Sequence, residues 1–89
     1  MKCVAAETPQ IREAMQFTGI NLEEITVWLR QRDPGVNTTI WEGMLLIKYG
    51  IIGNIVRASV GEYILDGPYG FSNIEKSKFE KEFTVLRHD

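Results

Sequence analysis

The sequence predicts an α+β fold, with an N-terminal strand and a helix packed on a small antiparallel β-meander and a short C-terminal helix. Three observations predict this class. Residues 21–32 carry apolar side chains at helical spacing, the middle of the chain alternates short apolar runs with glycine-containing turns, and 89 residues are enough for one domain, residues 1–89, but too few for two. Because so small a core gives modest stability, we also expect a homo-oligomer.

The segment before the main helix is less clearly patterned. Residues 1–9 have mixed polarity and are expected to be partly loose. Residues 11–17 fit a helical stripe as well as one face of a strand, so the pattern leaves both alternatives open. The Thr18-Gly19 pair ends this element in either case.

Residues 21–32 form the clearest predicted element. Asn21 is a favourable N-cap, and Glu24 follows at the spacing of a capping box. Acidic residues in the first turn and basic residues in the last turn suit the helix dipole. Asp33-Pro34-Gly35 ends the helix. The face expected to enter the core consists of Leu22, Ile25, Trp28 and Leu29.

Two apolar runs in the middle of the chain predict neighbouring strands. Residues 44–47 and 55–56 flank Gly53-Asn54, which is a tight-turn signal, and Gly50, which is expected to mark a bulge. Each run has the short length and apolar character of a strand.

The last third of the chain repeats this pattern and then changes it. Residues 62–65 predict another strand, and residues 66–70 contain enough turn formers to predict a turn after it. Residues 72–82 predict a short helix with Ser72 and Glu75 at capping-box spacing. Residues 83–86 would close the sheet as a last strand.

Charge and composition argue against most catalytic and nucleic-acid-binding classes. Twelve acidic against ten basic residues give a net charge of −2, without the clustered positive charge that direct nucleic-acid binding requires. The single cysteine, Cys3, and the single histidine, His88, lie at opposite ends of the chain, which does not favour a nucleophile with its base. No metal-ligand spacing or phosphate-binding loop is present. We therefore expect no enzyme, no cofactor and no membrane span, and a reduced cytosolic protein.

Carboxylates remain a possible source of chemistry only if the fold gathers them. Glu23 and Glu24 are sequence neighbours and point in different directions on a helix, so they are interpreted as dipole complements. An acid–base pair would instead need two members of a second set to converge. That set is Glu13, Glu42, Glu62 and Asp66.

Three residues form the candidate ligand site. Trp41 stands beside turn residues and Tyr69 lies within a turn, so both rings are expected to be exposed and able to stack on a flat ligand. Arg57 follows Val56 on a predicted strand and would present its guanidinium to a phosphate. The alternative is that the two rings pack on their own turns and that Arg57 is a solvated charge.

Two stretches resemble a family of small bacteriophage and prophage proteins. Residues 13–25 resemble the family opening E-A-x-Q-W-T-G-x-N-x-E-E-V, with Phe17 in place of its tryptophan. Residues 53–64 are similar to its G-x-M-x-A-x-x-G-D-Y-I-I motif, with one extra residue and Glu62 in place of aspartate. The family ending G-E-F-Y-P-C-K-P-D-I-F-E is kept only in outline, because the Tyr-Pro-Cys-Lys-Pro core is missing here.

The resemblance implies a strand for residues 11–17 and a phage or prophage origin, hence the cytoplasm of an infected bacterial host. It supplies no catalytic residues. With the candidate site, it predicts a non-enzymatic counter-defence protein that binds and sequesters a small, nucleotide-like host immune signal. The alternatives are a protein-blocking inhibitor of a host defence complex, similar in role to anti-CRISPR proteins, and a minor virion or assembly component.

Overall fold

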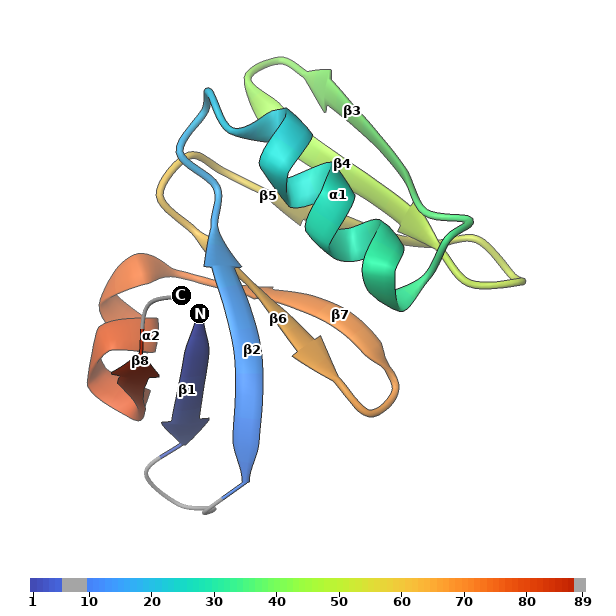
Figure 1. Ribbon diagram of the computed structural model, residues 1–89. Coiled ribbons are helices and arrows are strands. Elements are labelled where there is room, and N and C mark those ends of the chain that lie inside the picture. Colours follow the sequence, from blue (N-terminus) through green and yellow to red (C-terminus); the bar gives the residue numbers. More distant parts are fainter. Residues whose placement is uncertain (6–9, 88–89) are drawn as a thin grey trace.

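The predicted α+β class is confirmed by the computed structural model, which describes residues 1–5 and 10–87 (Figure 1). Its described residues form two helices and eight strands, and every strand pairing is antiparallel. In chain order the elements are β1 (Lys2–Ala5), β2 (Ile11–Gln16), α1 (Leu22–Arg32), β3 (Asn37–Trp41), β4 (Met44–Tyr49), β5 (Asn54–Ala58), β6 (Tyr63–Gly67), β7 (Gly70–Ile74), α2 (Lys76–Glu82) and β8 (Phe83–Arg87).

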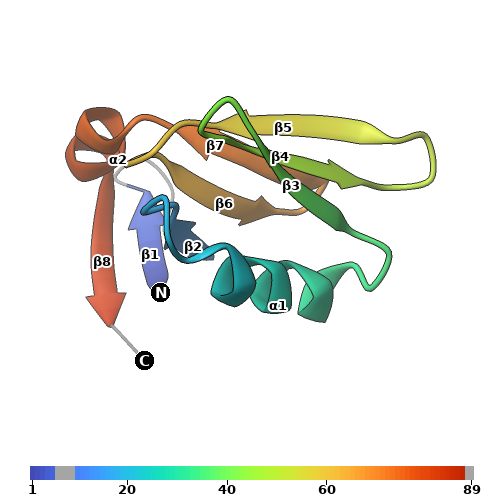
Figure 2. The same cartoon turned by 90° about the horizontal axis from the view of Figure 1, so that it is seen from above.

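The strands divide between two sheets. The order β3-β4-β5 is the meander that the middle of the chain predicts, whereas β6 and β7 join the terminal strands in the order β7-β6-β2-β1-β8. Helix α1 packs along the three-stranded sheet, where Thr26 Oγ1 lies 2.6 Å from Thr38 Oγ1 of β3. Figure 2 shows the strands β3, β4 and β5 on one side of the molecule and α1 on another.

The five-stranded sheet is covered on both faces. Strand β6 shows this clearly, because Ile64 enters one apolar cluster and its neighbours Tyr63 and Leu65 enter another, as the two-residue period of a strand requires. The first cluster lies between this sheet, α1 and the three-stranded sheet. The second includes Cys3 and is closed by Phe79 of α2.

Helix α1 confirms the predicted apolar face but corrects its cap. Ile25, Trp28 and Leu29 are buried, and Leu22 packs against them. The predicted capping box is wrong, because no side chain caps the first turn. Asn21 instead fixes the preceding turn: its Oδ1 accepts from the Thr18 N–H at 2.9 Å and its Nδ2 donates to a backbone carbonyl of β2 at 2.8 Å.

The ambiguous N-terminal segments are strands. Residues 11–16 form β2, in agreement with the resemblance, while Lys2–Ala5 form β1 and lie between β2 and β8. The expectation of a partly loose segment is therefore wrong for these residues, because β1 is held by strands on both sides; residues 6–9 lie outside the described residues. The predicted closing strand is confirmed as β8.

Three predicted local features are wrong. Residues 72–74 belong to β7, where Ser72 pairs with Leu65, so Ser72 is a strand residue and cannot cap α2. Gly50 opens a four-residue turn, residues 50–53, instead of forming a bulge, because Tyr49 and Asn54 already pair across it. For the same reason Gly53-Asn54 is not a tight two-residue turn: Gly53 ends the turn and Asn54 is the first residue of β5. Neither helix among the described residues is long and apolar enough to cross a membrane.

Candidate functional site

The three-stranded sheet leaves one of its two faces uncovered. Leu45 and Ile47 of β4 and Val56 of β5 are buried against α1 and the larger core. Side chains alternate along a strand, so the residues between them point to the opposite side. We call that side the outer face, and it consists of Thr39, Trp41, Met44, Leu46, Lys48, Ile55 and Arg57.

The outer face is more apolar than a solvated sheet face needs to be. Trp41 is 58% exposed and Ile55 is exposed to the same extent, while Met44 and Leu46 are half-buried. A shallow cavity of about 240 Å³ lies on this face, and its walls include side chains from all three strands. Aromatic, methionine and arginine side chains together are typical of binding surfaces.

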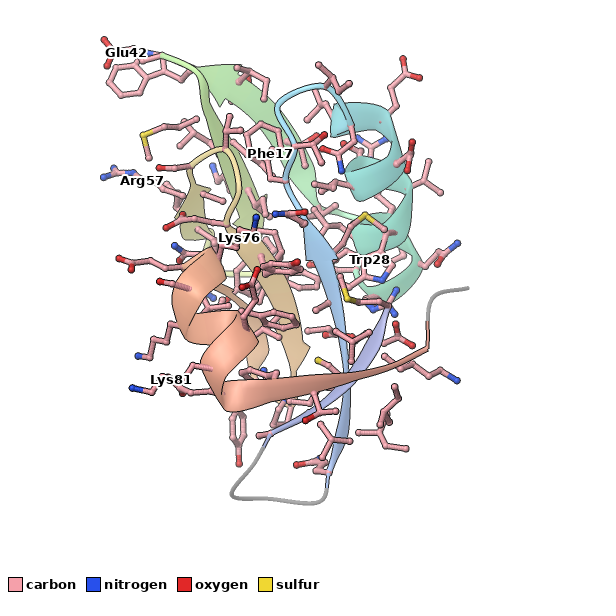
Figure 3. All side chains as sticks on the ribbon, turned by 90° about the vertical axis from the view of Figure 1, so that its left-hand side faces the viewer. Phe17, Trp28, Glu42, Arg57, Lys76 and Lys81 are labelled. Atoms are coloured by element: carbon pink, nitrogen blue, oxygen red, sulfur yellow. The ribbon has the colours of Figure 1, made fainter. Side chains whose placement is uncertain are left out.

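Two of the three predicted site residues share this face. The register pairs Trp41 with Met44 and Arg57 with Leu46. The two residues therefore stand on the opposite edge strands, β3 and β5, at positions two residues apart along β4. Sheet geometry then separates their Cα atoms by roughly 12 Å. Figure 3 shows the Arg57 side chain directed away from the body of the molecule, below the β3–β4 turn at Glu42.

The third predicted residue lies elsewhere. Tyr69 occupies the β6–β7 turn and is 98% exposed, as the turn pattern predicts. Its neighbour Gly70 packs on Tyr49, at the end of β4 opposite Met44 and Trp41. The structure therefore brings Trp41 and Arg57 together and leaves Tyr69 at the far end of the sheet.

Sequence reasoning missed Lys48, which supplies a second cation on the outer face. Lys48 pairs with Ile55 and shares the wall of the cavity. Its position follows from alternation with the buried Ile47 beside it, a signal that the apolar run of residues 44–47 obscures because both faces of β4 carry apolar side chains.

Two of the four candidate carboxylates lie close together, but both contact the guanidinium of Arg32 and so form an ion-pair network instead of an acid–base pair. Glu13 and Asp66 are cross-strand partners in β2 and β6. Arg32 Nε donates to Asp66 Oδ2 at 2.6 Å, and Arg32 Nη2 lies 3.9 Å from Glu13 Oε2. Arg32 also donates to the Trp28 carbonyl at 3.0 Å and lies 4.6 Å from the centroid of its ring. This network fastens the end of α1 to the five-stranded sheet.

The remaining two carboxylates lie apart from each other. Glu62 Oε1 accepts from the Ser59 N–H at 2.8 Å and from Asn73 Nδ2 at 3.2 Å, so Glu62 holds the β5–β6 turn. Glu42 lies in the β3–β4 turn. These contacts give the two residues separate positions, and the four carboxylates form no shared site.

The single thiol is a core residue. Cys3 is fully buried in the cluster closed by Phe79, and burial raises the pKa of its thiol, while Arg12 acts in the opposite direction. A raised pKa keeps the thiol in its less reactive protonated form. Among residues 1–5 and 10–87, no group of histidine, cysteine and carboxylate side chains is placed to hold a metal ion.

The lysine side chains of α2 belong to a solvated helix surface. Lys76 Nζ lies 3.9 Å from Glu80 Oε1, and Lys78 Nζ lies 3.9 Å from Glu82 Oε2, one helical turn further along in each case. Exposed pairs of this kind contribute little stability, and their charges cancel.

No protein-family model, curated protein or solved structure matches this chain, so its resemblance to the phage family stays a prediction.

Proposed function

We propose that the protein is a non-enzymatic binding protein that sequesters a flat, anionic, nucleotide-like ligand on the outer face of its three-stranded sheet. One observation carries the proposal: Trp41 and Arg57, which are distant in sequence, stand on the same sheet face with Lys48 and an apolar cavity. The aromatic platform, the cations and the apolar surface are the parts that such a ligand needs.

Each part has a separate task. The exposed ring of Trp41 offers a surface on which a base would stack. The Arg57 guanidinium matches the geometry of a phosphate and would donate two parallel hydrogen bonds, while Lys48 would add a point charge. The separation of Trp41 and Arg57 across the sheet leaves room for the base and the phosphate of one ligand. Noncovalent binding of a ligand, with no catalytic step, gives Trp41, Arg57 and Lys48 each a role.

The biological role follows from the resemblance to phage proteins and is part of the same proposal. A phage protein that holds a nucleotide-like host signal would lower its free concentration in the infected cell and so act as a counter-defence factor. Mass action sets the condition, since sequestration needs a dissociation constant below the concentration of the protein.

Isothermal titration calorimetry with a panel of cyclic and linear nucleotides tests the proposal. Loss of a stacking platform is worth about 1–3 kcal/mol, so Trp41→Ala should weaken binding roughly 5- to 150-fold. Arg57→Ala should weaken binding of phosphorylated ligands, and Trp41→Phe should retain most of the affinity. Tyr69→Ala is the matched control, because it removes an exposed ring that lies off the outer face.

The results separate the function from the site. No heat from any nucleotide overturns the proposed function. Binding that survives both Trp41→Ala and Arg57→Ala keeps the function but removes it from the outer face. An equal loss in Tyr69→Ala and Trp41→Ala would show that exposed rings contribute non-specifically.

A further inference from the structure

A second hollow lies where an edge strand of each sheet meets the other. Strand β5 is an edge of the three-stranded sheet and β7 an edge of the five-stranded sheet, and the two strands lie side by side (Figure 2). The hollow between them has a volume of about 510 Å³, and we call it the β5–β7 cleft. Its polar lining consists of Asn54 and Arg57 of β5 and Ser72 and Asn73 of β7.

The cleft and the outer face meet along β5. Ile55 lines both the β5–β7 cleft and the cavity of the outer face. Arg57, which would contact the phosphate in the proposed function, lines the cleft and not that cavity. A ligand held by Trp41 and Arg57 would therefore place its phosphate at the border between the two hollows.

Strand β7 leaves backbone groups open on the side of the cleft. In a two-residue hairpin the residues that flank the turn form a hydrogen-bonded pair, and bonded pairs then alternate with non-bonded pairs. Gly67 and Gly70 flank the β6–β7 turn, so the N–H and C=O groups of Phe71 and Asn73 lie on the open edge. Tyr49 Oη donates to the Phe71 carbonyl at 3.2 Å from the other sheet, which agrees with this alternation.

Strand β5 leaves backbone groups open in the same way. The two-residue β3–β4 turn assigns the backbone groups of residues 44, 46 and 48 to β3, so those of residues 45, 47 and 49 bond to β5. The N–H and C=O groups of Ile55 and Arg57 then lie on the open edge. Outside the strand ladders, neither these N–H groups nor those of Phe71 and Asn73 have a backbone partner among the described residues. Both walls of the cleft therefore offer backbone donors to a ligand.

The side chains divide the cleft into a cationic part and a neutral part. Arg57 forms no ion pair within residues 1–5 and 10–87, so its guanidinium is available to an anionic group. Asn73 Nδ2 donates to Glu62 Oε1 at 3.2 Å, which leaves Asn73 Oδ1 as an acceptor. An acceptor suits a ligand hydroxyl and not a phosphate oxygen. Asn54 and Ser72 add neutral polar groups on opposite walls.

We propose that the β5–β7 cleft holds a second sugar, joined to the base-bearing nucleoside through the phosphate that Arg57 contacts. This inference rests on the proposed function, because it uses the same Arg57 contact. The base would stack on Trp41, and the second sugar would lie between Asn54 and Asn73. The volume of the cleft is within the range of small-molecule sites. The preferred ligands are therefore phosphodiesters with a sugar on each side, and not mononucleotides.

Calorimetry with two phosphodiesters of equal charge tests this inference. The first probe is the methyl ester of adenosine monophosphate, and the second is diadenosine monophosphate, in which the phosphate joins two adenosines. The second probe differs by the nucleoside that replaces the methyl group. We expect it to bind about tenfold more tightly, because two added hydrogen bonds of ordinary strength give a difference of this size.

Variants of the cleft locate the added affinity. Asn54→Ala with Asn73→Ala should remove the advantage of diadenosine monophosphate and leave the affinity for the methyl ester unchanged. Gln10→Ala with Gln31→Ala is the matched control, since it removes two exposed amides away from both hollows. Ser72→Ala leaves the contact between Asn73 and Glu62 in place and should remove part of the advantage. Circular dichroism of each variant checks folding, and Ser72→Ala keeps the test decisive if the double substitution disturbs β5 or β7.

Amide NMR spectroscopy gives an independent measure of position. The side-chain amide signals of Asn54 and Asn73 should shift more with diadenosine monophosphate than with the methyl ester. Equal affinity for the two probes, an advantage that survives the cleft substitutions, or an equal loss in the Gln10 and Gln31 control would each overturn the inference while the proposed function stands. Absence of binding by both probes also overturns the inference, whereas the proposed function fails only if the whole nucleotide panel gives no heat.

Discussion

The two sheets differ in how they use their faces. Both faces of the five-stranded sheet are covered, one by α1 and the three-stranded sheet and the other by α2. The three-stranded sheet is covered on one face only, and its outer face carries Trp41, Ile55 and Arg57 in exposed positions. Most apolar residues in the first sheet are accounted for by packing within the chain, and its exposed ones, Ile11, Val85 and Leu86, lie at the first position of β2 and on the edge strand β8. Those on the outer face are not accounted for by such packing, which is why we assign binding to that face.

The two tryptophans give the strongest test of this difference. Trp28 is 8% exposed and packs beside Phe71, with ring centroids 6.4 Å apart, whereas Trp41 is 58% exposed. Trp28→Ala should therefore lower the free energy of unfolding by about 3–5 kcal/mol. Trp41→Ala should change it by no more than about 0.5 kcal/mol, as exposed positions do. Urea denaturation measures both, and comparable losses in the two variants would show that the outer face is part of the core.

Local patterns predicted the main helix and the turn after β6. The face of α1 and the 66–70 turn depend on residues close in sequence, and both are observed. The missed strands depend on partners far along the chain. Lys2–Ala5 become a strand because β8 pairs with them, and Asn37–Trp41, three of whose five residues are polar, pair with residues 44–48 of β4. No local period carries this information.

The candidate site shows the same limit. Turn neighbours correctly predicted that Trp41 and Tyr69 would be exposed. Whether an exposed ring lies beside Arg57 depends on strand register and on which sheet each hairpin joins. Those are tertiary choices, since β6–β7 leaves the meander to pair with β2. The sequence therefore predicted which residues are exposed, but not which of them share a face.

We expect the protein to lose stability at alkaline pH, because two titratable residues lie in the core between the five-stranded sheet and α2. Burial raises the pKa of Cys3 above its ordinary 9.0 and, together with the nearby Glu80, raises the pKa of Tyr63 above its ordinary 10.0. The unfolded chain loses these protons first as the pH rises, so the folded state loses stability there. The contribution is fully present below the ordinary pKa values and declines above them.

Urea midpoints between pH 7 and pH 11 measure this effect. We expect little change up to about pH 8.5 and a progressive fall beyond it. Cys3→Ala should delay the onset of the fall, and Tyr63→Phe should reduce its slope at the highest pH. Trp41→Ala should leave the pH dependence unchanged, because it alters only the outer face. A midpoint that rises with pH would contradict the sign of both shifts.

The smallest effect on stability is expected at the β3–β4 turn, which joins the outer-face residues Trp41 and Met44. Trp41 and Met44 pair directly, so Glu42 and Gly43 form a two-residue β3–β4 turn, with φ of 51° and 77°. Two left-handed residues define the turn type that suits the twist of a hairpin, and Asn-Gly is its preferred sequence. Glutamate pays a steric cost in this region that asparagine largely avoids. Glu42→Asn should therefore raise the free energy of unfolding by about 0.5–1 kcal/mol.

Gly43→Ala is the opposite control and should lower the free energy of unfolding, because a Cβ is introduced at positive φ where nothing else lies within contact distance. Urea denaturation of the pair separates backbone strain from lost packing, and a destabilised Glu42→Asn protein would show that the glutamate is held in the turn by a contact stronger than its strain.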